Sequence, residues 1–292
     1  MPKLSIITIN YNNASGLRKT MESVLNQTSK DFEYIVVDGG STDTSCQVIS
    51  DQCLVINGET FVNEILVKCV SEVDNGIYHA MNKGIKLAKG EYVQFLNSGD
   101  TIVAPNVTEL MLNRLFSPPS GELEGATDIL YGNMLKQLPN RILRDRGFAG
   151  RIPTMLDFYT GTLNHSSAYI KRNLFDTYGL YDESLRIVSD WKWYLQVIAL
   201  NGVMPVYKDI DLTLFDMNGI SNINSILDKT ERKKVLSEIL PVSVLIDYER
   251  WAFSIDQLRR INQYWITRKI FRLIERIFFK LEKWFKNKEQ EN

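Results

Sequence analysis

The 292-residue sequence lacks any uninterrupted run of about 18 apolar residues, the length that a membrane-spanning helix requires. Its amino-terminal stretch, residues 1–13, has too short an apolar run for a secretory signal and no cleavage pattern. Cysteine is scarce, since Cys46, Cys53 and Cys69 are the three present and none forms a CxxC pair. Spare thiols of this kind are typical of a reducing cytosol and speak against a zinc site. We therefore expect a cytoplasmic protein.

Charge and glycine patterning exclude two further classes of protein. The net charge is −1, so the chain has no overall field for a nucleic acid, and no nucleic-acid partner is expected. No Gly-x-Gly-x-x-Gly follows the first predicted strand, and no Walker loop occurs in the chain. A phosphate group bound here would therefore need another support than a glycine-rich loop, and a metal ion is the natural substitute.

Two periods alternate through the first hundred residues. Four short runs rich in β-branched residues predict strands buried on both faces, at residues 4–9, 33–38, 64–70 and 91–96. Between them, apolar residues at helical spacing predict helices over 15–26, with Ser15 as the cap, and over 77–88. This alternation predicts an α/β fold with a Rossmann-like, mostly parallel sheet flanked by helices.

The later chain is less regular. Residues 117–128 are rich in Pro, Gly and Ser and predict a surface loop, and residues 189–200 predict a helix that begins near Asp190. From residue 216 onward the pattern is helical. We therefore expect an α/β domain over residues 1–215, followed by a helical C-terminal extension over residues 216–292.

Polar residues follow each of the four predicted strands, in the segments TINYNN, DGGSTD, SEVDNG and NSGD. Parallel α/β sheets bind ligands at the carboxyl ends of their strands, so four polar exits predict a site at this edge. Asp38 ends the second strand, where an acid commonly accepts hydrogen bonds from a ribose or base. Asp100 follows the fourth strand beside Asn97 and Ser98, and is either a turn residue or a ligand. Mg²⁺ or Mn²⁺ needs only one or two protein carboxylates when phosphate and water complete its sphere.

Six motifs occur in order along the chain, and together they carry a resemblance. They are SIITINYNN, VVDGGSTD, SEVDNGIYHAMNKGI, GEYVQFLNSGD, NHSSAYIKRNLF and YDESLRIVSDWKWYLQ. The ordered set resembles bacterial family 2 glycosyltransferases of the GT-A fold, the kind encoded with capsule, exopolysaccharide and O-antigen pathways. The resemblance covers roughly residues 3–215 and leaves the C-terminal quarter outside. It implies transfer of a sugar from a nucleotide-diphospho-sugar, most often UDP-linked, to a saccharide or polyprenyl-linked acceptor.

The resemblance also implies roles for individual residues. Ten positions match those that contact the nucleotide-sugar in the family: Thr8, Asn10, Tyr11, Asp38, Asp74, Asn82, Lys83, Gly84, Ser98 and His165. For His165, a packed and hydrogen-bonded histidine is the alternative. Asp100 matches the last acid of a DxD-type metal motif, although Asn97, Ser98 and Gly99 stand where the fuller motif has its other acids. One carboxylate would then have to anchor the Mn²⁺ or Mg²⁺.

Asp190 matches the acid that the family uses as general base. A sugar hydroxyl has a pKa far above neutrality, so it attacks poorly unless a carboxylate accepts its proton. We expect the aromatic surroundings of Asp190 to raise its pKa, and a helix cap is its alternative role. We also expect Asp38, Asp74 and Asp100 to lie along one rim, with Asp190 across the cleft. A catalytically inert nucleotide-sugar-binding or scaffold protein is the alternative function, because the metal motif is reduced.

Residues 265–288 form an amphipathic pattern at ~100° per residue. One face gathers Ile266, Ile270, Ile274, Ile277, Phe278, Leu281 and Phe285, and the other gathers Arg268, Lys269, Arg272, Arg276, Lys280 and Lys283. Such a helix is typical of a membrane interface, which predicts peripheral attachment to the inner face of the cell membrane. Packing on the α/β domain or on a second subunit is the alternative.

Overall fold

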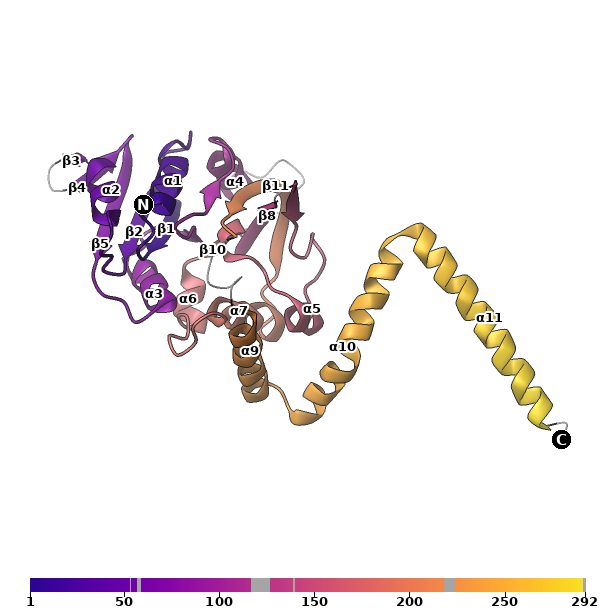
Figure 1. The fold of residues 1–292 in the computed structure, drawn as a ribbon. Coiled ribbons are helices and arrows are strands. Elements are labelled where there is room, and N and C mark those ends of the chain that lie inside the picture. Colours follow the sequence, from indigo (N-terminus) through magenta and orange to yellow (C-terminus); the bar gives the residue numbers. More distant parts are fainter. Residues whose placement is uncertain (53, 57–58, 117–126, 139, 218–223, 291–292) are drawn as a thin grey trace. The chain divides into compact units, whose positions relative to one another are not determined.

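The computed structural model describes residues 1–292 except 53, 57–58, 117–126, 139, 218–223 and 291–292 (Figure 1). Cys53 and most of the predicted loop at 117–128 lie outside the described residues. The chain forms two compact units, Met1–Val235 and Leu236–Asn292.

One mixed sheet of eleven strands organises the described part of the first unit. Its strands are β1 (Leu4–Asn10), β2 (Phe32–Asp38), β3 (Leu54–Ile56), β4 (Glu59–Val62), β5 (Ile65–Ser71), β6 (Tyr92–Phe95), β7 (Thr101–Ile102), β8 (Ile129–Leu138), β9 (Arg141–Asp145), β10 (Ala168–Lys171) and β11 (Pro205–Phe215). The order across the sheet is β3-β4-β5-β2-β1-β6-β10-β8-β11-β7, and β9 pairs with β8.

The four strands predicted from the amino-terminal sequence are the parallel part of this sheet. β5, β2, β1 and β6 pair side by side in parallel, so their carboxyl ends meet at one edge as expected. Beyond β6 the sheet changes character, because β10 pairs antiparallel with both β6 and β8, whereas β8 and β11 run parallel. The polar segments that follow these four strands therefore lie at a common edge of the sheet.

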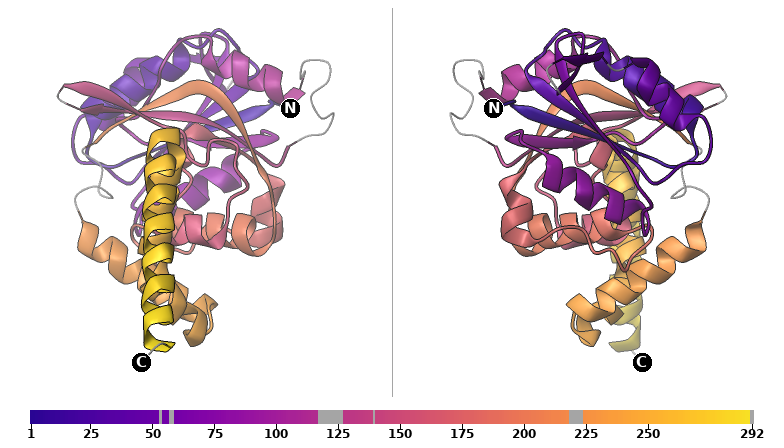
Figure 2. Two further views of the ribbon diagram at one scale, coloured as in Figure 1. Left: turned by 90° about the vertical axis from the view of Figure 1, so that its right-hand side faces the viewer. Right: turned by 90° about the vertical axis from the view of Figure 1, so that its left-hand side faces the viewer.

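Helices cover both faces of the sheet (Figure 1; Figure 2). The helices of this unit are α1 (Ala14–Leu25), α2 (Ser45–Gln52), α3 (Ile77–Leu87), α4 (Val107–Phe116), α5 (Met155–Thr160), α6 (Asn173–Tyr178) and α7 (Ser189–Tyr194), with a 3₁₀ turn η1 (His165–Ser167) and a π-helical segment η2 (Leu195–Leu200). Helix α9 (Ser225–Ile239) begins in this unit and ends beyond its boundary. The helices predicted at 15–26, 77–88 and 189–200 are confirmed, the last with a π-helical second half. Ser15 is not the cap of α1, because the Asn13 side chain accepts from the Gly16 amide instead.

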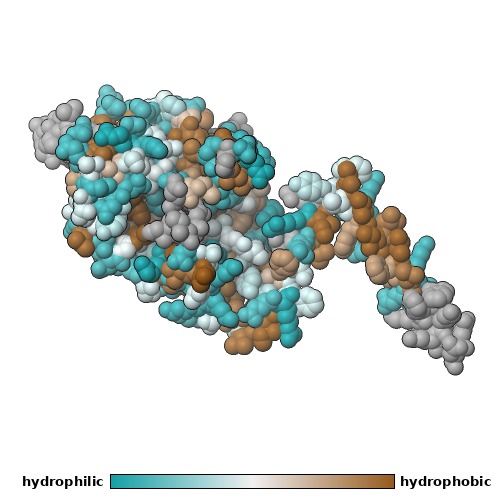
Figure 3. Space-filling model, viewed as in Figure 1, coloured by the Kyte–Doolittle hydropathy of each residue, from teal (hydrophilic) through white to brown (hydrophobic). Residues whose placement is uncertain are grey.

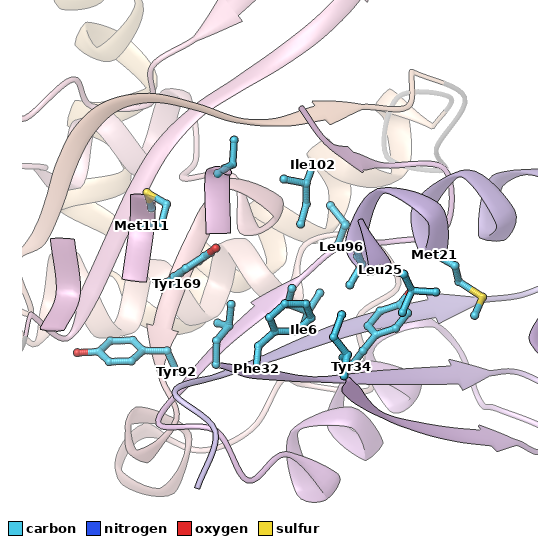
Figure 4. Close-up of a cluster of buried hydrophobic side chains, with 14 of the residues drawn as sticks. Ile6, Met21, Leu25, Phe32, Tyr34, Tyr92, Leu96, Ile102, Met111 and Tyr169 are labelled. Atoms are coloured by element: carbon cyan, nitrogen blue, oxygen red, sulfur yellow. The ribbon is translucent and has the colours of Figure 1, made fainter. Parts of the chain in front are cut away.

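A hydrophobic core fills the space between one face of the sheet and helices α1, α2 and α4 (Figure 4). β1 contributes Leu4 and Ile6, whereas α1 contributes Met21 and Leu25 and α4 contributes Met111. All of these side chains are buried, and apolar burial of this kind is the main favourable term in folding. Strands β1 and β2 are therefore held rigidly beneath the edge where their polar residues emerge.

The opposite face of the sheet is covered by α3, α6 and α7. Gly84 of α3 lies against Ile7 of β1 so closely that a Cβ atom on Gly84 would overlap the Ile7 side chain. Further along, the ring of Phe175 contacts Phe95 of β6 and stacks on Trp193 of α7 at 4.5 Å between centroids. Packing of α7 against this layer positions the amino-terminal residues of α7, including Asp190.

Replacing Gly84 with alanine is expected to destabilise the protein by about 1–2 kcal/mol, because overpacking against Ile7 outweighs the gain in helix propensity. Urea unfolding of the purified protein measures the change. The same substitution made together with Ile7→Ala should cost less, since the overlapping methyl group is then absent. An equal cost in both backgrounds would contradict the close-packing explanation for this glycine.

The second unit contains helices α10 (Val242–Gln263) and α11 (Trp265–Gln290). The boundary falls after Val235, later than the predicted boundary after residue 215, because the start of α9 packs on the first unit. The Glu231 carboxylate accepts hydrogen bonds from the backbone amides of Arg186 and Ile187 at 2.8 and 3.0 Å. No helix that the described residues form has both the length and the apolar content to cross a bilayer.

Candidate active site

A cavity of about 770 Å³ opens at the carboxyl edge of the sheet. Ser98, Asp100, His165 and Asp190 all line it. The structure thus brings together four sequence-predicted residues that lie up to ninety-two positions apart in the chain, from Ser98 to Asp190. A cavity of this size has the volume typical of a small-molecule site.

The turn from β6 to β7 presents Asp100 to the cavity. Gly99 has a φ of 109°, a conformation that favours glycine, and the Thr20 hydroxyl of α1 donates to the Asp100 carbonyl oxygen at 2.7 Å. The Asp100 Oδ1 atom accepts a hydrogen bond from the Asp216 backbone amide at 2.8 Å. The Oδ2 atom is buried and has no hydrogen-bond partner among the described residues. An orphaned buried carboxylate oxygen facing a cavity is suited to receive a cation.

Burial raises the pKa of Asp100 to about 7. The Asp216 amide and the positive charge of His165 lower this pKa, whereas the Asp216 carboxylate raises it further. At neutral pH such a carboxyl is about half ionised, and a positive charge beside it would favour the ionised form. The surroundings of Asp100 are therefore better suited to a carboxylate that binds a metal ion than to a carboxylate without one.

Asp216, directly after β11, is a third acid at the cavity, and the sequence motifs did not reveal it. It lines the cavity, and a Cβ atom built on Gly99 would lie 2.5 Å from the Asp216 Oδ2 atom. Asn97 also lines the cavity, and its Oδ1 atom is buried without a hydrogen-bond partner in the described structure. Asp100, Asp216 and Asn97 thus place oxygen atoms, the ligands that Mg²⁺ and Mn²⁺ prefer, around one turn.

Asp190 is held from two sides. Its Oδ1 atom accepts a hydrogen bond from the Tyr78 hydroxyl at 2.8 Å, and its Oδ2 atom lies 3.0 Å from Nδ1 of His165. Nε2 of His165 lies 3.2 Å from the Asn97 amide, so the histidine joins Asp190 to the turn that carries Asp100. Each carboxylate oxygen has a second lone pair besides the one used in its hydrogen bond. Asp190 can therefore still accept a proton from a molecule in the cavity that it lines.

The expectation that aromatic surroundings raise the pKa of Asp190 is wrong. Burial does raise this pKa, but the hydrogen bond and positive charge of His165, with the Tyr78 hydroxyl, lower it overall. For His165, burial lowers the pKa and the Asp190 carboxylate raises it, with a net increase. Each group therefore favours the charged form of the other, and the lowered pKa keeps Asp190 ionised and able to accept a proton at neutral pH.

Asp38 is the centre of a buried hydrogen-bond network. Its two oxygens accept from the Asn10 amide at 2.7 Å, from the Ser41 hydroxyl and amide at 2.6 and 2.9 Å, and from the Ser71 hydroxyl at 2.8 Å. Burial raises the pKa of Asp38, but these donors lower it overall. The Ser98 hydroxyl donates to Asn10 at 2.8 Å and so links this network to the cavity. Asp38 holds the ends of β1, β2 and β5 together, and its direct contact with a base stays a prediction.

Asp74 and Tyr11 both lie close to Gly39. A Cβ atom on Gly39 would lie 3.3 Å from the Tyr11 ring and 3.4 Å from the Asp74 Oδ2 atom. The Asp74 Oδ1 atom pairs with Nζ of Lys83 at 2.5 Å and with Nδ1 of His79 at 2.9 Å, whereas the described residues offer its buried Oδ2 atom no hydrogen bond. The Tyr11 residue is 66% exposed. An exposed ring beside an unsatisfied acceptor is an arrangement suited to a nucleoside.

Three predicted contact residues have interior positions, and their contact with the nucleotide-sugar stays a prediction. The Thr8 hydroxyl lies inside the sheet, where it donates to the Leu96 carbonyl at 2.7 Å. The Asn82 amide donates to the Tyr181 carbonyl at 2.9 Å, and Gly84 allows α3 to approach β1. Because their groups are used within the protein, these residues support the site from behind in this conformation.

Tyr78 and Asp216 were missed by sequence reasoning. Each is more than a hundred residues from the acid that it contacts. Asp216 lies outside the six motifs, and Tyr78 lies inside one of them without a predicted role. Lys19 and Arg186 also line the cavity and carry positive charge to its wall. A weak signal existed for Tyr78, because it lies in the first turn of the helix that carries Asn82 and Lys83.

Comparisons with known proteins identify the family of the chain. A family model described as Glycosyl transferase family 2 matches residues 5–179. A PGL/p-HBAD biosynthesis glycosyltransferase of Mycobacterium tuberculosis is 26% identical over 255 residues, which cover 86% of this chain and 91% of that protein. An uncharacterized glycosyltransferase of the same species is 31% identical over 225 residues, with 76% of this chain and 78% of that protein covered.

Two solved structures share the fold. S. aureus TarS 1-349 in complex with UDP-GlcNAc has a TM-score of 0.60 and 22% sequence identity, over 80% of this chain. The mannosyltransferase PcManGT from Pyrobaculum calidifontis, in complex with GDP-Man and Mn²⁺, has a TM-score of 0.61 and 16% identity, over 81% of this chain. The matched region spans 64% of each solved chain. The sequence resemblance is thereby confirmed, and the chain belongs to glycosyl transferase family 2 and has the GT-A fold.

Proposed function

We propose that this glycosyltransferase moves a sugar from a UDP-sugar, with inversion, to a saccharide or polyprenyl-linked acceptor in cell-surface polysaccharide biosynthesis. The observation that carries the proposal is that Asp100 and Asp190 line the same cavity. One acid there is suited to a cation beside a diphosphate, and the other is an ionised base. Those are the two groups that transfer from a nucleotide-sugar requires.

The donor base would lie at the edge formed by Tyr11, Gly39 and Asp74. The exposed Tyr11 ring offers a stacking surface, and the unsatisfied Asp74 Oδ2 atom offers an acceptor for a ribose hydroxyl or base N–H. TarS is solved with UDP-GlcNAc and PcManGT with GDP-Man, and we propose uridine for this chain because the sequence resemblance implies a UDP-linked donor. From that edge, Ser98 leads into the cavity through its hydrogen bond to Asn10.

The residues present fit a divalent cation. Asp100 offers its orphaned Oδ2 atom, and Asp216 and Asn97 add oxygens at the same turn. The described residues contain no group of three His, Cys, Asp or Glu side chains arranged to hold a metal by themselves. An open site of this kind is typical of Mg²⁺ or Mn²⁺ bound largely by phosphate and water. When bound, the cation would stabilise negative charge on the departing nucleoside diphosphate.

Asp190 is proposed to accept the proton of the acceptor hydroxyl as that oxygen attacks the anomeric carbon. The new bond joins the acceptor oxygen to the anomeric carbon, the bond from that carbon to the diphosphate oxygen breaks, and the hydroxyl proton passes to Asp190. A single attack from the side opposite the leaving group inverts the anomeric centre. The hydrogen bonds from Tyr78 and His165 fix the orientation of the Asp190 carboxylate while it acts.

Replacing His165 with asparagine is expected to move the acidic limb of the kcat pH profile to higher pH. The pKa of Asp190 is lowered by the positive charge of His165, so removing that charge raises the pKa. Below the new pKa, Asp190 is protonated and cannot act as a base. Steady-state rates measured from about pH 3 to pH 8, a range that begins below the ordinary pKa of an aspartate, test this. An acidic limb that does not move would contradict the coupling.

A thermal-shift screen of nucleotide-sugars, with and without Mn²⁺, tests the proposed donor. Binding to the folded protein raises the melting temperature by an amount that grows with affinity and ligand concentration. UDP-sugars are expected to give the largest shifts, and only when Mn²⁺ is present. Equal shifts in melting temperature for guanosine and uridine donors would contradict the proposed base. Shifts that are the same with and without Mn²⁺ would contradict the proposed metal dependence.

A further inference from the structure

Helix α11 has a surface that the described side chains of its own unit leave exposed. Seven apolar residues on one side of the helix are 45–68% exposed: Ile266, Ile270, Leu273, Ile274, Ile277, Phe278 and Leu281. Figure 3 shows hydrophobic residues gathered along the described part of this helix. We call these seven residues the apolar face. Exposed apolar surface on this scale is unusual unless it binds something.

The opposite side of α11 is basic. From Trp265 to Gln290 the helix has eight Lys and Arg residues against three Glu residues, a net charge of +5 in a chain whose total is −1. Lys269 and Lys280 lie next to the apolar face at ~100° per residue, and their long stems can extend toward headgroups beside it. The Glu residues gather on the other flank.

Segregation of this kind is confined to α11 among the three long C-terminal helices. The neighbouring helices α9 and α10 distribute their apolar and polar residues around the helix. α11 combines strong segregation with a high content of Lys, Arg and Glu, and none of the helices formed by the described residues can cross a bilayer. A helix that is apolar on one side, basic on the other and too polar to insert across a membrane is suited to lie in its interface.

We infer that α11 docks on the surface of an anionic lipid bilayer, with its apolar face among the acyl chains and its basic residues at the headgroups. The net charge of α11 favours anionic lipid over a second copy of the helix as the partner of the apolar face. A second copy of α11 would bring another +5 helix against the first, whereas anionic lipid would neutralise it. This inference concerns the helix alone and does not depend on the proposed chemistry, although an acceptor held in lipid would give the attachment a use.

Vesicle co-sedimentation of the full chain tests the docking. The protein should pellet with vesicles that contain phosphatidylglycerol, much less with phosphatidylcholine alone, and less again at high salt. Ile277→Asp places a charge in the apolar face, whereas Phe279→Asp adds the same charge among the basic residues. Ile277→Asp should weaken binding roughly tenfold more than its partner variant, because only it removes an apolar side chain from the lipid-facing side.

The results of these experiments distinguish lipid docking from dimer formation and from loss of catalysis. Equal losses for Ile277→Asp and Phe279→Asp, or no pelleting with anionic vesicles, would overturn the inference. A concentration-dependent dimer that Ile277→Asp dissociates, without vesicle binding, would show instead that a second copy covers the apolar face. Asp190→Asn should pellet like the unaltered protein, so loss of catalysis and loss of docking are measured apart. Transfer to a short soluble acceptor should be unchanged by Ile277→Asp.

Discussion

Replacing Asp190 with asparagine should lower kcat for sugar transfer by about 10²–10⁴-fold, the range that a positioned general base supplies. Asparagine keeps the size of the side chain and can still bond to Tyr78 and His165, but it cannot accept the proton of the acceptor hydroxyl. The nucleotide edge at Tyr11 is untouched by the change. Quantified product formation under saturating donor and acceptor measures the loss.

The control is donor affinity. Isothermal titration with UDP and Mn²⁺ should give the same dissociation constant for Asp190→Asn and the unaltered protein. The substitution Tyr78→Phe removes one hydrogen bond to Asp190 and leaves the carboxylate, so it should lower kcat far less. If Asp190→Asn retained most of the transfer rate, the base would have to be another residue of the cavity.

Replacing Asp100 with asparagine should remove the dependence of donor binding on Mn²⁺ and weaken binding by roughly tenfold or more, since the carboxylate charge is lost and an amide oxygen is a weaker ligand for a hard cation. The Asp216 backbone amide can still donate to the new side chain, so the turn is retained. Titration of UDP with and without Mn²⁺ measures both effects, and persistent stimulation by Mn²⁺ would place the cation elsewhere.

The same variant has an opposite effect on stability. Asp100 has a pKa of about 7 when folded, against an ordinary value of 3.8. Its contribution to stability is therefore full below pH 3.8 and is lost as the pH rises through about 7, at up to about 1.4 kcal/mol per pH unit. Without metal, Asp100→Asn should melt above the unaltered protein at about pH 8 and should lose this advantage at about pH 4. Mn²⁺ with UDP should reverse the order at the higher pH.

The parallel half of the fold was predictable because its signals are local. Strands β1, β2, β5 and β6 and helices α1 and α3 follow from hydrophobic periodicity, and their order dictates which strand ends share an edge. The antiparallel strand β10 and the paired strands β8 and β11 were not assigned, because pairing between strands far apart in the chain leaves no periodic trace in either partner.

The site was predictable to the extent that its residues lie in motifs. Asp100, Asp190, Ser98 and His165 reach one cavity as the resemblance implied. Asp216 could not be found, because it approaches Asp100 only through the pairing of β11 with β7, which tertiary structure alone creates.

Motif position also says little about what a side chain does once the chain has folded. Asn82 and Gly84 match a donor-binding segment, yet one holds the loop at Tyr181 and the other permits close packing on Ile7. The lowered pKa of Asp190 likewise depends on His165, a partner twenty-five residues away whose contact no spacing predicts.

The most direct test of the account is a crystal structure of the Asp190→Asn variant with an intact UDP-sugar and Mn²⁺. We expect an Asp100 oxygen within about 2.2 Å of the metal. We also expect residue 190 to face the anomeric carbon from the side opposite the diphosphate. A diphosphate bound away from Asp100, or a residue 190 on the same side as the leaving group, would contradict the proposed inverting chemistry.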